Sequence, residues 1–171
     1  TGHLIIAEYM ASRTDLEQVW FVVSPHNPLK LRSTLANDFD RLHMVQMAID
    51  DNPRLKASNI EFSLPKPSYT IDTMVYLHEK YPQHQFSLIM GSDNLGSISK
   101  WKNYELLLER YIIHVYKREG IPIDQSLIPA ADIRIYDVPM LDISSTYIRQ
   151  SIADGLSIRY MVPESIYQFL D

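Results

Sequence analysis

The sequence predicts an α/β fold, specifically a doubly wound, Rossmann-like parallel sheet with helices on both faces. Two observations lead to this fold class. Short apolar runs typical of buried strands alternate with longer segments in which apolar residues recur every three or four positions, as in amphipathic helices. Alternating strands and helices are typical of a parallel sheet, because each crossover must return the chain to the same end of the sheet. The 171 residues and 46% apolar content suit one domain over residues 1–171.

The first elements follow from apolar patterns and capping residues. Helical spacing covers residues 4–11, and the apolar run at 18–23 indicates a strand buried on both faces, with Trp20 in the core. After a loop that contains prolines, Asn37 or Asp38 caps a helix that reaches Ile49. The residues of this helix that we expect to face inward are Phe39, Leu42, Val45 and Ile49.

The middle of the chain continues the alternation. A second strand is expected at residues 56–62, and the turn at 65–68 leads into a helix over 70–81 that Pro82 ends. A buried strand at 86–90 follows.

The last part of the chain completes the pattern with a helix at 104–110, strands at 112–116 and 133–136, and two closing helices. Gly155 supplies the C-terminal stop of the first closing helix. The chain starts directly in a helix, whereas the first strand of a doubly wound sheet usually lies near its centre. We therefore expect a missing first strand, with about 15 to 20 further residues upstream of Thr1.

Charge and composition exclude several classes of partner and site. The net charge of −5 argues against nucleic acid or an anionic membrane as a partner, because such binding needs surplus Lys and Arg. The absence of cysteine excludes disulfides, thiolate nucleophiles and Cys-ligated zinc, and it suits a cytoplasmic protein. No apolar run approaches the length needed to span a bilayer. The sequence leaves a homo-oligomer open.

The helix that starts near Ser144 has the features of a phosphate site. Ser144 or Ser145 is a natural N-cap, and Arg149 lies one turn into the helix with its side chain tilted back toward the helix start. Free backbone N–H groups, the positive end of the helix dipole and a guanidinium all favour a phosphate there. Taken alone, the same residues also fit an ordinary capped helix with a surface arginine.

Two other classes of site lack their signatures. The spacing of the remaining histidines is not that of metal ligands, so we interpret them as structural or exposed and expect no protein metal site. These histidines are His43, His78, His84 and His114. The segment Gly91-Ser92-Asp93 lacks the Gly-x-Ser-x-Gly elbow of serine hydrolases.

Motifs near the two ends of the chain resemble those of the nucleotidyltransferase superfamily. Gly2-His3 resembles the end of His/Thr-x-Gly-His, and residues 143–149 read Ile-Ser-Ser-Thr-Tyr-Ile-Arg against the pattern Ile-Ser-Ser-Thr-x-x-Arg. Between them lie Pro67-Ser68-Tyr69-Thr70, Gly91-Ser92-Asp93-Asn94 and Trp101. This ordered set resembles the bacterial nicotinate-nucleotide adenylyltransferases of NAD biosynthesis.

The resemblance implies adenylyl transfer from ATP, carrying Mg²⁺, to nicotinate mononucleotide, with nicotinate adenine dinucleotide and pyrophosphate as products. It implies catalytic roles for His3 and Arg149. The ATP-binding residues that it implies are Gly2, His3, Gly91, Asp93, Ile143, Ser145, Thr146 and Arg149. The residues implied for nicotinate mononucleotide are Lys30, Tyr69, Thr70 and Trp101, with Tyr69 and Thr70 meeting the pyridine carboxylate and Trp101 stacking on the ring.

The chain departs from the family pattern at two places. The first histidine of His-x-Gly-His would precede Thr1, and the loop at 24–30 reads Ser-Pro-His-Asn-Pro-Leu-Lys where many members have Pro-Pro-His-Lys or Pro-Pro-His-Arg. Lys30 can take the basic position, while the role of His26 stays open.

Other interpretations also remain open. A related nucleotidyltransferase with nicotinamide mononucleotide or phosphopantetheine as acceptor fits the same motifs, and so does a nucleotide-binding module without catalysis. Individually, His3, Tyr69-Thr70 and Gly91-Asp93 also fit structural capping or turn roles, and Trp101 fits an aromatic that packs on the next helix.

Overall fold

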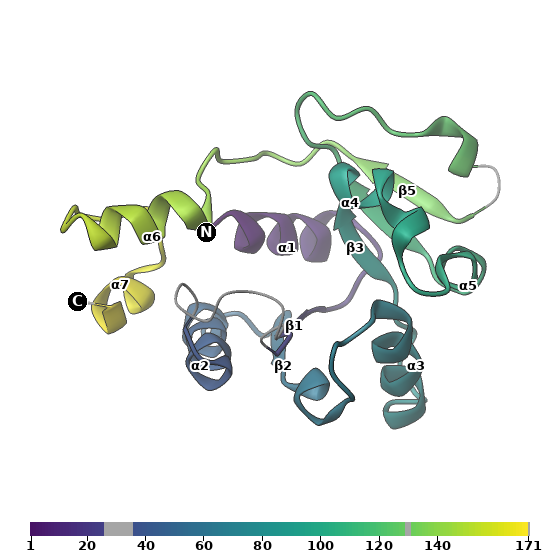
Figure 1. Cartoon of the computed structure of the whole chain (residues 1–171), viewed down its shortest axis with the longest axis horizontal. Helices are drawn as coiled ribbons and strands as arrows, with labels where there is room; N and C mark the ends of the chain where they lie inside the picture. Colours follow the sequence, from purple (N-terminus) through teal and green to yellow (C-terminus); the bar gives the residue numbers. More distant parts are fainter. Residues whose placement is uncertain (26–35, 129–130, 171) are drawn as a thin grey trace. The chain divides into compact units, whose positions relative to one another are not determined.

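The computed structural model describes residues 1–25, 36–128 and 131–170, and its contacts divide the chain into two compact units. Unit 1 comprises Thr1–Asn59 and Pro139–Asp171, and unit 2 comprises Ile60–Val138. Each unit has its own parallel sheet with flanking helices (Figure 1). The predicted α/β class with parallel strands is confirmed, and a single domain over the whole chain stays a prediction.

Unit 1 is built on two parallel strands, β1 (Val19–Val22) and β2 (Leu55–Ser58), with Val19 opposite Leu55. Its helices are α1 (Gly2–Arg13), α2 (Asp38–Ile49), α6 (Ser145–Ala153) and α7 (Glu164–Leu170). α7 lies against α2, where the Ser165 hydroxyl donates to the Met47 carbonyl at 3.2 Å and the rings of His43 and Phe169 meet edge to face. The C-terminal helix is therefore anchored to an element more than a hundred residues earlier in the chain.

Unit 2 is built on the parallel sheet β3-β4-β5. Its strands are β3 (Leu88–Gly91), β4 (Ile113–Tyr116) and β5 (Ile133–Tyr136). Its longer helices are α3 (Thr70–Lys80) and α5 (Tyr104–Arg110); the short ones are η2 (Ile60–Ser63), α4 (Ser92–Gly96), η3 (Ile98–Lys100) and η4 (Gln125–Leu127). The core of the unit gathers on one face of β4, where Ile113 and Val115 are fully buried with Leu95 and Ile98 beside them.

Most predicted elements are confirmed, but three expectations are wrong. The strand expected at 56–62 ends at Ser58, because Ile60–Ser63 turns into a 3-10 helix that buries Ile60 and Glu61. Trp20 is only half-buried: its indole N–H donates to the Gln18 side chain, and Lys56 lies over its ring at 4.1 Å. Phe39 is 73% exposed. It lies in the first turn of α2, about 80° around the helix from the buried Ile49.

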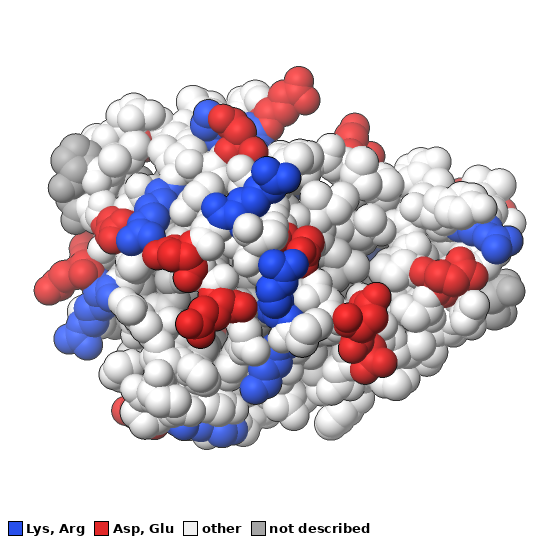
Figure 2. Space-filling model, turned by 180° about the vertical axis from the view of Figure 1, so that it is seen from behind, with Lys and Arg blue, Asp and Glu red and all other residues white. Residues whose placement is uncertain are grey.

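Charges of both signs intermingle on the face drawn in Figure 2. In the described part of the chain, no helix is both long and apolar enough to cross a membrane.

Candidate functional site

The start of α6 brings together the phosphate-binding features that the sequence predicts. Ser144 is the N-cap, and its hydroxyl accepts from the Tyr147 backbone N–H at 3.1 Å. The Arg149 guanidinium reaches back to the Thr146 hydroxyl at 3.3 Å, so the cation lies over the first turn as expected. Ser145, Thr146 and Arg149 are exposed, while Ile143 is half-buried. An anion can therefore reach the hydroxyls, the guanidinium and the helix start together.

The far end of α6 explains why this helix stops where it does. Gly155 has a left-handed φ of +68°, its N–H bonds the Ile152 carbonyl, and the Leu156 N–H bonds the Ser151 carbonyl at 2.8 Å. This pair of bonds is a Schellman motif, which requires a residue that tolerates positive φ. The predicted stop at Gly155 is confirmed.

Gly2 and His3 form the first turn of α1, in the same unit as α6. His3 is exposed, and a Cβ at Gly2 would meet no atom within 4 Å. Unit 1 thus contains His3, Arg149 and the starts of both helices.

In unit 2, the turn from β3 into α4 is closely packed around Gly91. A Cβ at this position would overlap the Asp93 carboxylate and lie 3.1 Å from the Tyr116 ring on β4. Tyr116 is buried, and this burial raises the pKa of its phenol above the ordinary value, while Arg118 acts in the opposite direction. A glycine is needed here because Asp93 and Tyr116 approach the backbone closely. The backbone conformation does not require it, since a φ of −78° suits any residue.

Asp93 has one oxygen that is paired and one that is not. Oδ2 accepts from the Arg118 guanidinium at 3.1 Å. Oδ1 is buried and has no hydrogen-bond partner among the described residues. Ser92 fixes the adjoining loop, since its buried hydroxyl accepts from the Arg118 backbone N–H at 2.9 Å. A buried acceptor at the carboxyl end of β3 is suited to a hydroxyl donor such as a ribose.

Tyr69 and Thr70 start α3 without a side-chain cap. Tyr69 is the N-cap, is 43% exposed, and makes no side-chain capping bond. Ser, Thr, Asp or Asn at that position would bond the first backbone N–H groups, whereas tyrosine leaves them to an outside acceptor. The start of α3 is therefore open to an anionic ligand.

The same helix turn is held from inside the unit by a buried pair. The Thr73 hydroxyl donates to Glu61 Oε1 at 2.8 Å and also lies 3.2 Å from the Tyr69 carbonyl oxygen. Glu61 is 7% exposed. This pair joins η2 to the first turn of α3 and thereby positions Tyr69.

Trp101 and Lys102 occupy different environments although they are adjacent in the chain. Trp101 is partly buried and packs against the core cluster of unit 2, which accords with the structural interpretation of this residue. Lys102 bonds Asp72 at 2.7 Å and lies over the Tyr69 ring at 4.9 Å. These contacts place Lys102 directly beside Tyr69.

The structure thus groups the predicted residues by unit. Gly2, His3 and residues 143–149 lie in unit 1, and Tyr69, Thr70, Gly91, Asp93 and Trp101 lie in unit 2. Lys30 and His26 lie outside the described residues. Within the described ranges, no group of three or more His, Asp or Glu side chains could hold a metal ion.

Sequence reasoning missed four residues beside these groups: Glu61, Thr73, Lys102 and Arg118. Arg118 comes just after β4, so the rule that ligands bind beyond the carboxyl ends of parallel strands could have found it. Lys102 follows Trp101 directly. The Glu61–Thr73 pair has no local sequence signal.

Comparison with known proteins gives a consistent family. A family model described as cytidylyltransferase-like matches residues 1–151. A relative from Flavobacterium johnsoniae, named as a probable nicotinate-nucleotide adenylyltransferase, is 50% identical over 99% of this chain and 89% of its own. The Flavobacterium psychrophilum protein of the same name is 48% identical with the same coverage.

A solved structure has the same fold. The nicotinic acid mononucleotide adenylyltransferase of Plasmodium falciparum, solved in complex with NaAD, matches with a TM-score of 0.77 at 18% identity, over 98% of this chain and 88% of the other. Together with the two bacterial relatives, the motifs at Gly2-His3 and residues 143–149 establish that the chain belongs to the nicotinate-nucleotide adenylyltransferase family.

Proposed function

We propose that this protein transfers the adenylyl group of ATP to nicotinate mononucleotide, giving nicotinate adenine dinucleotide and pyrophosphate. A phosphate oxygen of the mononucleotide attacks the α-phosphorus of ATP, and the bond to the β-phosphate oxygen breaks as pyrophosphate leaves. The nucleophile belongs to the substrate, so the protein's task is to align two anions and to neutralise the charge that develops. The observation that best supports this function is the Arg149 guanidinium folded back over the hydroxyl-rich start of α6.

The start of α6 is assigned to the triphosphate. Arg149 offers a planar fork of donors that matches phosphate oxygens, and Ser145 and Thr146 add hydroxyl donors. His3, in the first turn of α1, is assigned to the charge that grows on the phosphates in the transition state. A group with this role contributes more to turnover than to binding of the ground state.

The β3–α4 turn is assigned to the nucleotide ribose. Asp93 Oδ1 is a buried acceptor without a protein partner among the described residues, and vicinal ribose hydroxyls are donors of the right chemistry. Gly91 is assigned to the same turn, where the absence of a side chain lets the Asp93 carboxylate lie close to the backbone.

The open start of α3 is assigned to the pyridine carboxylate. The uncapped N–H groups after Tyr69 and the Thr70 hydroxyl supply donors, and the helix dipole favours an acid over a neutral amide. Trp101 is assigned to ring stacking and Lys30 to the mononucleotide phosphate.

Magnesium is assigned to the ATP substrate. Mg²⁺ in nucleotide enzymes is commonly held by substrate phosphates and water with few protein ligands. We also propose a cytoplasmic enzyme with one nucleotidyltransferase domain, with no nucleic-acid or membrane partner, and we leave a homo-oligomer open.

The direct test supplies ATP and Mg²⁺ with nicotinate mononucleotide, nicotinamide mononucleotide or phosphopantetheine, each in a separate reaction. Formation of nicotinate adenine dinucleotide with one pyrophosphate per product supports the proposal. Faster product formation from either of the other acceptors would assign the protein to a different substrate. Tight ATP binding without product from any of the three would indicate a nucleotide-binding module.

A further inference from the structure

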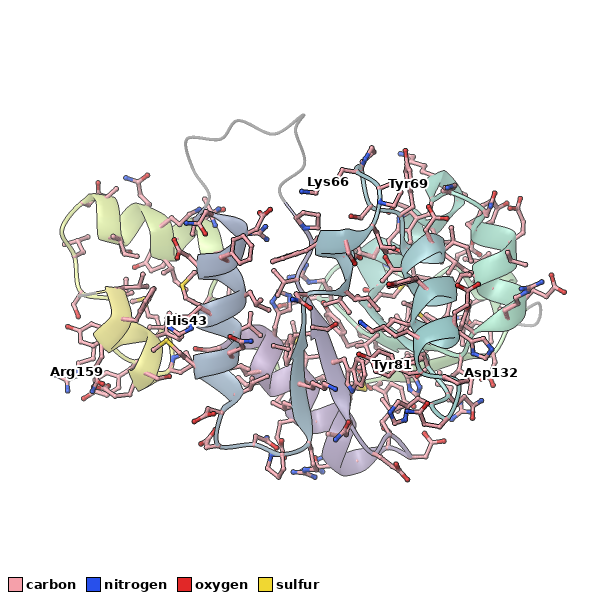
Figure 3. The ribbon with its side chains drawn as sticks, turned by 90° about the horizontal axis from the view of Figure 1, so that it is seen from below. His43, Lys66, Tyr69, Tyr81, Asp132 and Arg159 are labelled. Atoms are coloured by element: carbon pink, nitrogen blue, oxygen red, sulfur yellow. The ribbon has the colours of Figure 1, made fainter. Side chains whose placement is uncertain are left out.

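A hollow of about 400 Å³ lies in unit 2 beside the start of α3. It is lined by residues 64–69 together with Asp72 and Lys102. Figure 3 shows Lys66 and Tyr69 at this end of α3, with Tyr81 at the opposite end. The hollow therefore adjoins the uncapped helix start that we assign to the pyridine carboxylate.

The Lys102 ammonium group contacts two residues at this helix start, Asp72 and Tyr69. Lys102 Nζ is 2.7 Å from Asp72 Oδ2 and 4.9 Å from the centre of the Tyr69 ring. Asp72 lies in the first turn of α3, two residues after Thr70. The Lys102 and Asp72 side chains are 44% and 48% exposed, so solvent partly screens their pairing.

The negative charge of Asp72 has two opposite effects at the start of α3. A carboxylate in the first turn of a helix is stabilised by the helix dipole. The same negative charge repels an anionic ligand that approaches the N–H groups of that turn. A cation bonded to Asp72 removes the repulsion without removing the residue.

We propose that Lys102 determines the preference for nicotinate over nicotinamide mononucleotide by neutralising Asp72 at the start of α3. This inference rests on the proposed function. Lys102 acts here as a specificity-determining residue: it sets the local charge, and it takes no part in the chemical step. The amide has no charge on its pyridine substituent and is therefore insensitive to whether Asp72 is neutralised.

Three variants are expected to affect the acid-to-amide ratio of kcat/KM differently. Lys102→Met should lower kcat/KM for the acid by about three- to tenfold, as expected for exposing one partly screened charge, and should leave the amide nearly unchanged. Asp72→Asn should raise the acid-to-amide ratio, because Lys102 is then an unpaired cation. The double variant Asp72→Asn/Lys102→Met should return close to the wild-type ratio. The differences should shrink at high salt.

The matched control is Lys100→Met, which removes an exposed lysine on the other side of Trp101 that does not line the hollow. Circular dichroism and thermal unfolding confirm that each variant is folded. An acid-to-amide ratio that is the same in wild type, Lys102→Met and Asp72→Asn overturns the inference. Wild-type protein that makes no dinucleotide from nicotinate mononucleotide overturns the proposed function instead, so the two failures are distinguishable.

Discussion

Replacing Gly91 by alanine tests the packing of the nucleotide turn with a single methyl group. The backbone at Gly91 has φ −78° and ψ 158°, which alanine adopts freely, so no backbone strain is introduced. The added Cβ would overlap the Asp93 carboxylate and lie 3.1 Å from two carbons of the Tyr116 ring. Tyr116 is 8% exposed on the central strand of its sheet, so its ring has little room to move. Asp93 must therefore move instead.

The expected cost follows from this geometry. Overpacking a well-filled region by one methyl group typically costs about 1–3 kcal/mol. In a chain of this size, 1 kcal/mol corresponds to about 2–4 °C in Tm. A displaced Asp93 also loses its proposed bond to the ribose, so the KM for ATP should rise about five- to thirtyfold for a loss of about 1–2 kcal/mol.

Gly96→Ala is the matched control, since a Cβ there meets no atom within 4 Å. It ends α4, so alanine should leave stability unchanged or raise it by up to about 1 kcal/mol. The assays are thermal unfolding and steady-state kinetics with ATP varied at saturating mononucleotide. A Gly91→Ala protein with wild-type Tm and wild-type KM for ATP would refute the close-packing argument.

Three further substitutions test other parts of the account. Arg149→Ala should reduce kcat/KM for ATP by an amount equivalent to about 1.5–3 kcal/mol, which is the usual range for a hydrogen bond to a charged group. Arg149→Lys should recover part of this loss, and wild-type ATP kinetics in the folded Arg149→Ala protein would remove Arg149 from the site. His3→Ala should lower kcat more than it raises either KM, and unchanged kcat would return His3 to a structural role. Thr73→Val should lower stability by about 1–3 kcal/mol, measured by urea unfolding, because it leaves the Glu61 carboxylate buried without its partner. Thr73→Ser keeps the hydroxyl and serves as its control.

Local signals in the sequence predict the parts of the fold that depend on local chemistry. The cap at Ser144 and the stop at Gly155 are specified by residue types that supply a hydroxyl and a positive φ, so α6 and the position of Arg149 follow from its sequence. The strand at 133–136 and the helix at 104–110 likewise follow from their apolar spacing.

Contacts between distant residues could not be predicted in this way. The Lys102–Asp72 pair joins residues thirty positions apart, and the Glu61–Thr73 pair joins residues twelve apart. Residues 60–62 have the alternation of a strand, yet tertiary packing turns them into a 3-10 helix. Packing also decides the environment of Trp101, because an aromatic residue between two lysines fits a binding surface and a core edge equally well in sequence.

The most direct test of the central claim is a competition between the two pyridine mononucleotides. The full-length protein is given ATP, Mg²⁺ and equal concentrations of nicotinate and nicotinamide mononucleotide, and the dinucleotide products are separated by anion exchange and compared with pyrophosphate released. The account predicts that nicotinate adenine dinucleotide is the main product and matches pyrophosphate one to one. Nicotinamide adenine dinucleotide as the main product, or pyrophosphate release without either dinucleotide, would contradict it.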